Sequence, residues 1–292
     1  MRWLKQLLHQ GTYPIGERHV DRSAWIADDA WSCLLARHAF LARLSPDQRA
    51  RLRHLCGAFL ADKSINGAGG LVLTDVMIGS IAVQACLPIL ELGLDAYPAF
   101  SEIIVYPSDF IVDREIVDEN GVVHAWTEAI AGESWDGGPI VLAWDAASGE
   151  NSGRAHRPAP APFNVVIHEF AHKLDMANCV VDGTPLFMRR LHPGLDEGAW
   201  QDVLAASLHD FAARVDAVEA AIPRHIDPES ARADRHYASL PFDAYAETDE
   251  AEFFSVATEA FFIAPTRLQV AYPRLYELFV AYYRQDPCAA NS

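Results

Sequence analysis

The sequence predicts an α+β protein that is mainly helical and carries a small sheet. Long stretches of helical character lie before residue 100 and after residue 162, and short β-branched and aromatic runs lie between them. A third observation is a His-Glu-x-x-His pattern directly after the block of strands, inside an apolar run of helical character. This pattern makes the helix that carries it the centre of the chain's chemistry.

Composition limits the possible functions. The chain has 292 residues, of which 51% are hydrophobic and 22% are charged, a balance that can build a sizeable core in one large domain or two small ones. The net charge of −17 argues against nucleic acid or an anionic membrane as the main partner. No apolar run reaches the roughly 20 residues of a membrane span, and we expect no signal peptide.

Cysteine usage indicates the compartment. The five cysteines are odd in number and contain no C-x-x-C pair, so neither a disulfide framework nor a zinc ribbon is expected. A reducing cytoplasm is therefore the predicted location.

The N-terminal region, residues 1–100, is predicted to be helical. Ser45 and Pro46 form a helix start signal, with the serine as N-cap and the proline at the first helical position. Around it we expect the following elements: an arm at 1–20, helices at 24–44, 45–61 and 74–88, and a turn at 66–70.

The period of the sequence changes after residue 101. Strands are expected at 103–106 and 110–112, then at 122–126 after a turn at 118–121, and finally at 139–144. Residues 101–292 are predicted to form the catalytic region, packed with the N-terminal region as one compact unit. Its remaining elements are a loop at 146–162, helices at 163–177, 199–221, 248–264 and 273–285, and an exposed, proline-rich insertion at 222–244.

The His-Glu-x-x-His pattern consists of His168, Glu169 and His172. Residues four apart lie on one face of a helix, so the two histidines can bind one ion together. Two histidines and a carboxylate suit one Zn²⁺ and leave a fourth position open for water, for which Glu169 is the expected base. Such a short pattern also arises by chance, but two buried histidines and a glutamate would be costly without a partner.

A third ligand is expected from the apolar segment 245–262. Glu252 and Glu259 are seven residues apart, on one helical face with apolar neighbours. The alternative, a solvated helix end, fits Glu247, Asp249 and Glu250 better. Cys179 and the other histidines are expected to have ordinary structural roles.

Taken together, these segments resemble the Mlc titration factor A family of zinc metallopeptidases and, more distantly, the catalytic domain of the anthrax lethal factor. The resemblance rests on His168 to Asp175 and on Tyr245 to Phe262, and it covers most of residues 25–285. Further matching segments lie at 63–71, 73–75, 84–88, 104–107 and 138–142.

The resemblance implies a zincin fold of the gluzincin type, with a small mixed sheet packed on the metal helix and residues 139–144 as the edge strand beside the cleft. It implies His168, His172 and Glu252 as the zinc ligands. Glu169 would be the general base and Tyr245 would stabilise the oxyanion.

The resemblance also bears on the surroundings of the ligands. It suggests Asp175 and Glu259 as residues that hold the histidine rings, although the lethal factor has a glutamate where this chain has Val256. Glu252 lies 84 positions after His168 (252 − 168), which exceeds the spacing in the best-known members, and the extra length is expected in 222–244.

Two functions are implied by the resemblance. The first is zinc-dependent, aminopeptidase-like hydrolysis of a peptide or protein substrate. The second is sequestration of an Mlc-like transcriptional repressor, which would regulate the glucose phosphotransferase system. The alternative is a repressor-binding regulator whose peptidase activity is weak or vestigial.

Overall fold

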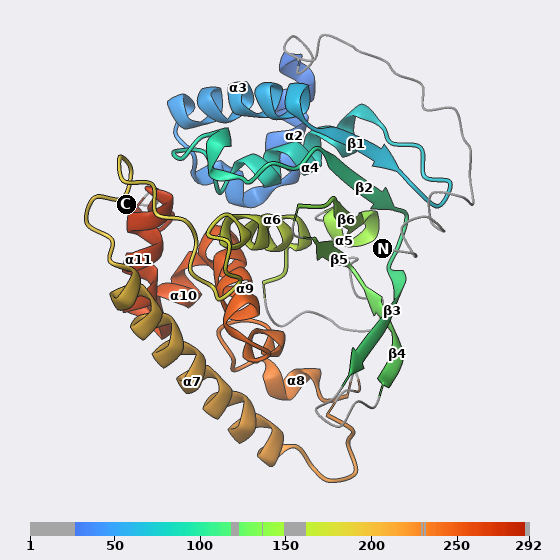
Figure 1. Ribbon diagram of the computed structural model, residues 1–292, viewed down its shortest axis with the longest axis vertical. Helices are drawn as coiled ribbons and strands as arrows, with labels where there is room; N and C mark the ends of the chain where they lie inside the picture. Colours follow the sequence, from blue (N-terminus) through green and yellow to red (C-terminus); the bar gives the residue numbers. More distant parts are fainter. Residues whose placement is uncertain are drawn as a thin grey trace.

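The structure, a computed structural model, describes residues 27–117, 123–135, 137–148, 162–228, 230 and 232–289, with only the backbone at 111–117 and 123–129. Figure 1 shows the N-terminal helices and a sheet in the upper part and the C-terminal helices at the lower left, with α6 (Val165–Met176) between them. The architecture is thus mainly helical α+β with a small mixed sheet, as predicted. Predictions that lie outside the described residues are the arm at 1–20, the turn at 118–121 and most of the loop at 146–162.

The N-terminal helices are α2 (Asp28–Arg37), α3 (Pro46–Asp62) and α4 (Asp75–Cys86). The predicted start of α3 is confirmed: Gln48 N donates to Ser45 Oγ at 3.2 Å, and Ser45 N donates to the Gln48 side chain at 2.9 Å. The predicted helix 24–44 is interrupted after Arg37, and a short 3₁₀ helix, Ala39–Arg43, follows. α4 packs on α2, α3 and α6 and thereby joins these helices to the centre of the protein.

The four-stranded sheet has the order β1 (Ser64–Gly67), β2 (Glu102–Tyr106), β6 (Ile140–Ala143) and β5 (Gly132–Ser134). β1, β2 and β6 are parallel, whereas β5 is antiparallel to β6. The prediction that 139–144 forms the edge strand is therefore wrong. All four residues of β6 are buried, as befits a strand covered on both faces, and the short β5 takes the edge.

The predicted turn at 66–70 is also partly wrong. Ile65 is buried opposite Ile103, and this pairing makes residues 64–67 a strand. The turn begins only afterwards, at Gly69 and Gly70, which have φ values of 60° and 82° that favour glycine. The expected hairpin is confirmed: β3 (Phe110–Val117) pairs antiparallel with β4 (Val123–Ile130) and extends from the sheet (Figure 1).

The C-terminal helices surround a core of aromatic side chains. Trp200 stacks on Phe279 with ring centroids 5.5 Å apart, and Phe254 packs against both rings. These C-terminal helices are α7 (Glu197–Ala221), α9 (Glu250–Ile263), α10 (Pro265–Ala271) and α11 (Pro273–Tyr283). The remaining short elements are the single-turn helices α5 (Trp144–Ala147) and α8 (Asp234–Tyr237) and the 3₁₀ helices Leu94–Ala96 and Ala244–Glu247.

The segment 222–244, predicted to be exposed, is only partly so: exposed and buried residues alternate along its described part. Phe242 is 1% exposed and stacks on Phe211 of α7 with centroids 4.7 Å apart. Ile222, Ile226 and Leu240 are buried as well. The prolines and polar residues of this segment mark its irregular backbone, whereas its few apolar side chains decide its burial.

All five cysteines are free thiols. Within the described part of the chain, every helix is too short or too polar to cross a lipid bilayer.

Candidate metal centre and catalytic cleft

Helix α6 places both histidines of the His-Glu-x-x-His pattern. Asn164 caps the helix, because its side-chain oxygen accepts a hydrogen bond from Ile167 N at 2.9 Å. The helix is buried among α4, α9 and β5, so its polar residues must find partners in the interior. His168 and His172, one turn apart, are each 9% exposed, and their Nε2 atoms lie 3.1 Å from each other.

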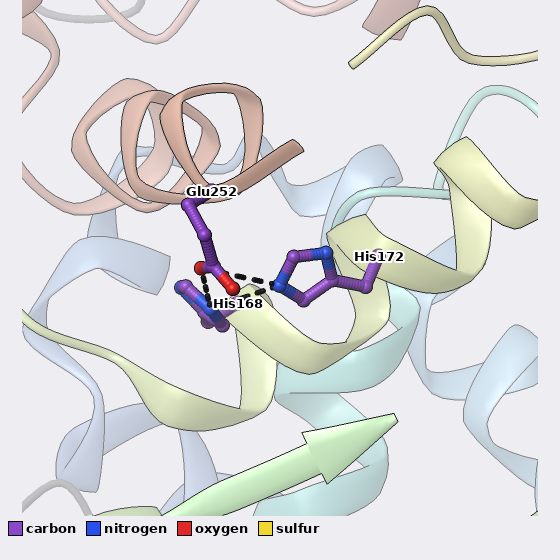
Figure 2. A group of neighbouring side chains, drawn as sticks. All are labelled: His168, His172 and Glu252. Carbon is purple, nitrogen blue, oxygen red and sulfur yellow. Dashed lines mark hydrogen bonds and ion pairs between the residues drawn. The ribbon is translucent and has the colours of Figure 1, made fainter. Parts of the chain in front are cut away.

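Helix α9 brings a carboxylate to the two histidines. Asp249 caps α9 by accepting from Glu252 N at 2.9 Å, so Glu252 lies in the first turn. Its Oε2 is 3.1 Å from His168 Nε2 and 3.4 Å from His172 Nε2. Figure 2 shows the three side chains converging from the two helices, with dashed lines between them. The structure thus brings together the three residues that the sequence predicts as ligands.

The three side chains fit a divalent metal ion. One ligand atom from each residue lies within 4.8 Å of the others. Glu252 Oε2 is buried and has no hydrogen-bond partner among the described residues. It is joined to the two imidazoles by ion pairs. Two imidazole nitrogens and one carboxylate oxygen form a donor set typical of Zn²⁺.

Electrostatics support the same arrangement. Burial alone would raise the pKa of Glu252, but hydrogen bonds and charge interactions with His168 and His172 outweigh burial and lower it well below its usual range. The carboxylate is therefore ionised, as a metal ligand must be.

Glu169 lies beside the cluster and is 4% exposed. Burial raises its pKa, although the neighbouring histidines partly oppose this shift. The edge strand β5 covers the backbone at this point, because Ser134 Oγ donates to Glu169 O at 2.8 Å. A carboxyl with a raised pKa beside a candidate metal-binding cluster is suited to accept and return a proton.

Gly132 and Ser134 line the cleft beside Glu169, and the sequence prediction did not include them. A Cβ atom at Gly132 would lie 2.5 Å from Glu169 Oε1 and 2.6 Å from Val165 Cγ2, so only glycine allows β5 to approach α6 this closely. The available signal was a glycine next to a strand-like run, which often marks a close backbone approach.

Tyr245 stands on the open side of the cluster, in the 3₁₀ helix before α9. Its hydroxyl donates to Glu252 Oε1 at 3.3 Å, its ring centroid is 6.4 Å from that of His168, and its side chain is 46% exposed. The predicted residue therefore reaches the cluster from the solvent side.

Glu259 and Asp175, the two suggested partners of the histidine rings, differ in position. Glu259 Oε1 accepts from His168 Nδ1 at 2.8 Å, and the carboxylate is 1% exposed. Asp175 instead accepts from Gly183 N at 2.9 Å, and no hydrogen bond among the described residues joins it to either histidine. Only Glu259 thus holds a ring of the cluster directly.

The cluster opens into a cleft of about 460 Å³. β5 forms one wall, and Tyr245, Asp243 and Asp249 stand on another. Apolar side chains, among them Phe163, Met176, Val181 and Val256, line it as well. The cleft has room for part of a peptide, with the paired histidines exposed to it.

Comparison with known proteins assigns the family. The model of the glucose-regulated metallo-peptidase M90 family matches residues 16–284. The chain belongs to this family. Relatives named Mlc titration factor A include one from Salmonella arizonae, 36% identical over 94% of this chain and 97% of its own length. Another, from Klebsiella pneumoniae strain 342, is 37% identical over 90% of this chain and 91% of its own length. The resemblance to the Mlc titration factor A family that was predicted from the sequence is confirmed.

Proposed function

We propose that the chain is a zinc-dependent metallopeptidase in which His168, His172 and Glu252 hold one zinc ion. The convergence of these three side chains beside the buried carboxyl of Glu169, inside one cleft, carries the proposal. Membership of a metallopeptidase family supports it. When bound, zinc supplies Lewis acidity and lowers the pKa of water towards neutrality.

Glu169 acts as the general base and then as the general acid. It takes a proton from the attacking water and passes it to the leaving amine, a role for which its raised pKa is suited. The Tyr245 hydroxyl donates a hydrogen bond to the oxyanion that forms on the peptide carbonyl. To do so it gives up its hydrogen bond with Glu252, which its exposed position permits.

The outer edge of β5 holds the substrate. Among the described strands, β5 pairs only with β6, so its other edge is open to an extended peptide. A peptide added there would pass the cluster, because Gly132 and Ser134 of this strand contact Glu169. An aminopeptidase-like preference, inferred from the family resemblance, is part of the proposal.

Zinc content and peptidase turnover test the metal site. Wild-type protein should hold one zinc per chain, and His168→Ala should lose both zinc and turnover. His209→Ala is the matched control, because His209 is an exposed histidine on α7. Stoichiometric zinc retained in His168→Ala would refute the ligand assignment.

A second function is sequestration of an Mlc-like transcriptional repressor, which would regulate the glucose phosphotransferase system from the cytoplasm. The name of the relatives, with alignments over 90% or more of this chain, favours it. In the alternative form of this proposal, repressor binding is the main role and the peptidase activity is weak or vestigial.

The variant Glu169→Gln separates the two functions. Glutamine keeps the shape of glutamate but cannot accept the proton, so turnover should fall by about 10²–10⁴ while zinc is retained. Pull-down of the repressor by the same preparation should be unchanged if binding uses another surface. Full turnover in Glu169→Gln would mean that the proposed mechanism is wrong.

A further inference from the structure

The buried side of the cluster continues beyond Glu259 into a chain of hydrogen bonds that reaches helix α4. Glu259 accepts from His168 Nδ1 through one oxygen and from the main-chain N of Asn164 through the other. The side chain of Asn164 in turn donates to Gln84 Oε1 at 2.7 Å. We propose that Asn164 and Gln84 are positioning residues, which hold Glu259 and through it fix the ring of His168.

The side chain of Asn164 has two partners, Ile167 N and Gln84, and one possible orientation. Its Oδ1 accepts from Ile167 N, so Nδ2 must point towards Gln84. Its main-chain N is outside the helix and free to serve Glu259. One residue thus caps α6, donates to Glu259 and connects both to α4.

Gln84 is fixed in the same way. Its Nε2 donates to Ser80 O at 3.0 Å and to Ala147 O at 3.1 Å. A flipped amide would place its oxygen against these two carbonyls and its NH₂ group against that of Asn164. Only the observed orientation satisfies every partner, so Gln84 determines the orientation of Asn164.

Burial makes each link costly to break. Gln84 and Glu259 are each 1% exposed and Asn164 is 6% exposed, so water cannot readily replace a lost partner. A buried polar group without a partner costs about 1–3 kcal/mol, and the neighbouring groups would move to avoid this cost. Movement of Glu259 would release the His168 ring, whose Nδ1–H it accepts.

The orientation of this ring matters for metal binding. When Nδ1 donates to Glu259, the other ring nitrogen, Nε2, is directed at His172 and Glu252 and can serve as the ligand atom. Groups that hold ligand histidines typically contribute a factor of 10–100 to metal affinity. The relevance to zinc rests on the function proposed above, whereas the effect on the His168 ring does not depend on it.

Two variants test the proposal. Gln84→Leu removes the partner of Asn164. Asn164→Ser keeps a good helix cap and the main-chain donor, which protects the fold, but loses the amide NH₂ group that donates to Gln84. Tyr97→Phe is the matched control, because the Tyr97 hydroxyl donates to Ala85 O of α4 at 2.6 Å outside this chain of hydrogen bonds.

The first measurement is the NMR signal of the His168 Nδ1–H in metal-free protein. It should shift and exchange faster with solvent in both variants, and it should remain unchanged in Tyr97→Phe. The second measurement is zinc affinity by competition with a chelator, which should weaken about 10–100-fold in both variants. Tyr97→Phe should lower the stability of the fold without changing this chain of hydrogen bonds, so its zinc affinity should be unchanged.

The outcomes are distinct. An unchanged Nδ1–H signal in both variants would overturn the positioning role. A changed signal in protein that binds no zinc even as wild type would support the positioning role and would contradict the proposed metallopeptidase instead.

Discussion

The two sides of the His168–His172–Glu252 cluster are built in opposite ways. On the interior side, Glu259, Asn164 and Gln84 are at most 6% exposed and linked by hydrogen bonds. On the cleft side, Tyr245 is 46% exposed, and its hydroxyl lies 3.3 Å from Glu252 Oε1. The interior side thus fixes the ring of His168, whereas a group on the cleft side can exchange its partner for a molecule that enters the cleft.

This contrast predicts different consequences of substitution. On the interior side, a lost group leaves a buried partner unsatisfied, so stability and metal affinity should fall. On the cleft side, water can replace a lost group in the resting protein, so turnover should fall while the fold and the metal are retained.

Among the substitutions that test this contrast, the largest effect is expected for Tyr245→Phe. Loss of one oxyanion donor typically lowers kcat by about 10²–10³, and zinc content should be unchanged because Tyr245 is no ligand. Steady-state kinetics and metal analysis of the same preparation provide the test. Tyr237→Phe is the control, since that hydroxyl contacts Glu219. Loss of zinc in Tyr245→Phe would show that the cleft side also holds the metal centre.

A second effect concerns His38, which lies beyond Gln84 on the interior side. Gln84 donates to Ser80 O, and His38 Nε2 lies 2.8 Å from Ser80 Oγ. Burial, with a contribution from Arg37, lowers the pKa of His38 from 6.5 to about 4. Below pH 6.5 the unfolded chain binds a proton that the folded chain does not, so stability falls as the pH falls. Between pH 7 and pH 4 this loss is about 3 kcal/mol.

Urea unfolding of wild type and His38→Gln at several pH values measures this loss. Glutamine does not titrate, so the difference in free energy of unfolding between the two proteins should change by about 3 kcal/mol over this range. Parallel curves for the two proteins would contradict the prediction.

A third effect concerns the wall of the cleft. Gly132→Ala places a methyl group within 2.5–2.6 Å of Glu169 Oε1 and Val165 Cγ2, so β5 or Glu169 must shift. A displacement of about 1 Å at a catalytic group can reduce the rate about 10²-fold, and zinc should be retained. Gly194→Ala is the control, because a Cβ there meets nothing within 4 Å. Normal turnover in Gly132→Ala would show that the close approach of β5 is dispensable.

The smallest effect is expected for Ser134→Ala. This change removes the hydrogen bond to Glu169 O and should lower the free energy of unfolding by about 1 kcal/mol. Ser64→Ala, which removes an exposed hydrogen bond to Ser101 O, should cost less in the same denaturation assay. Equal losses in the two variants would mean that β5 is held to α6 by packing alone.

The sequence by itself determined the local part of the site. His168, Glu169 and His172 lie within two turns of one helix, and the helical repeat places the histidines on one face without help from the rest of the chain. Glu252 could also be predicted, because a carboxylate on an apolar helical face matched the family resemblance. The helix cap at Ser45 was also predictable from the local sequence, because its partner Gln48 is only three residues away.

Only the tertiary structure decided the groups that act across long distances in the chain. The position of β6 inside the sheet depends on its pairing with both β2 and β5, and the burial of Phe242 depends on Phe211 of another helix. Asn164 and Gln84 are 80 positions apart, and neither stands in a pattern that predicts the other. Hydrogen bonds and close contacts of this kind require two segments to meet, whereas hydrophobic periodicity describes one segment at a time.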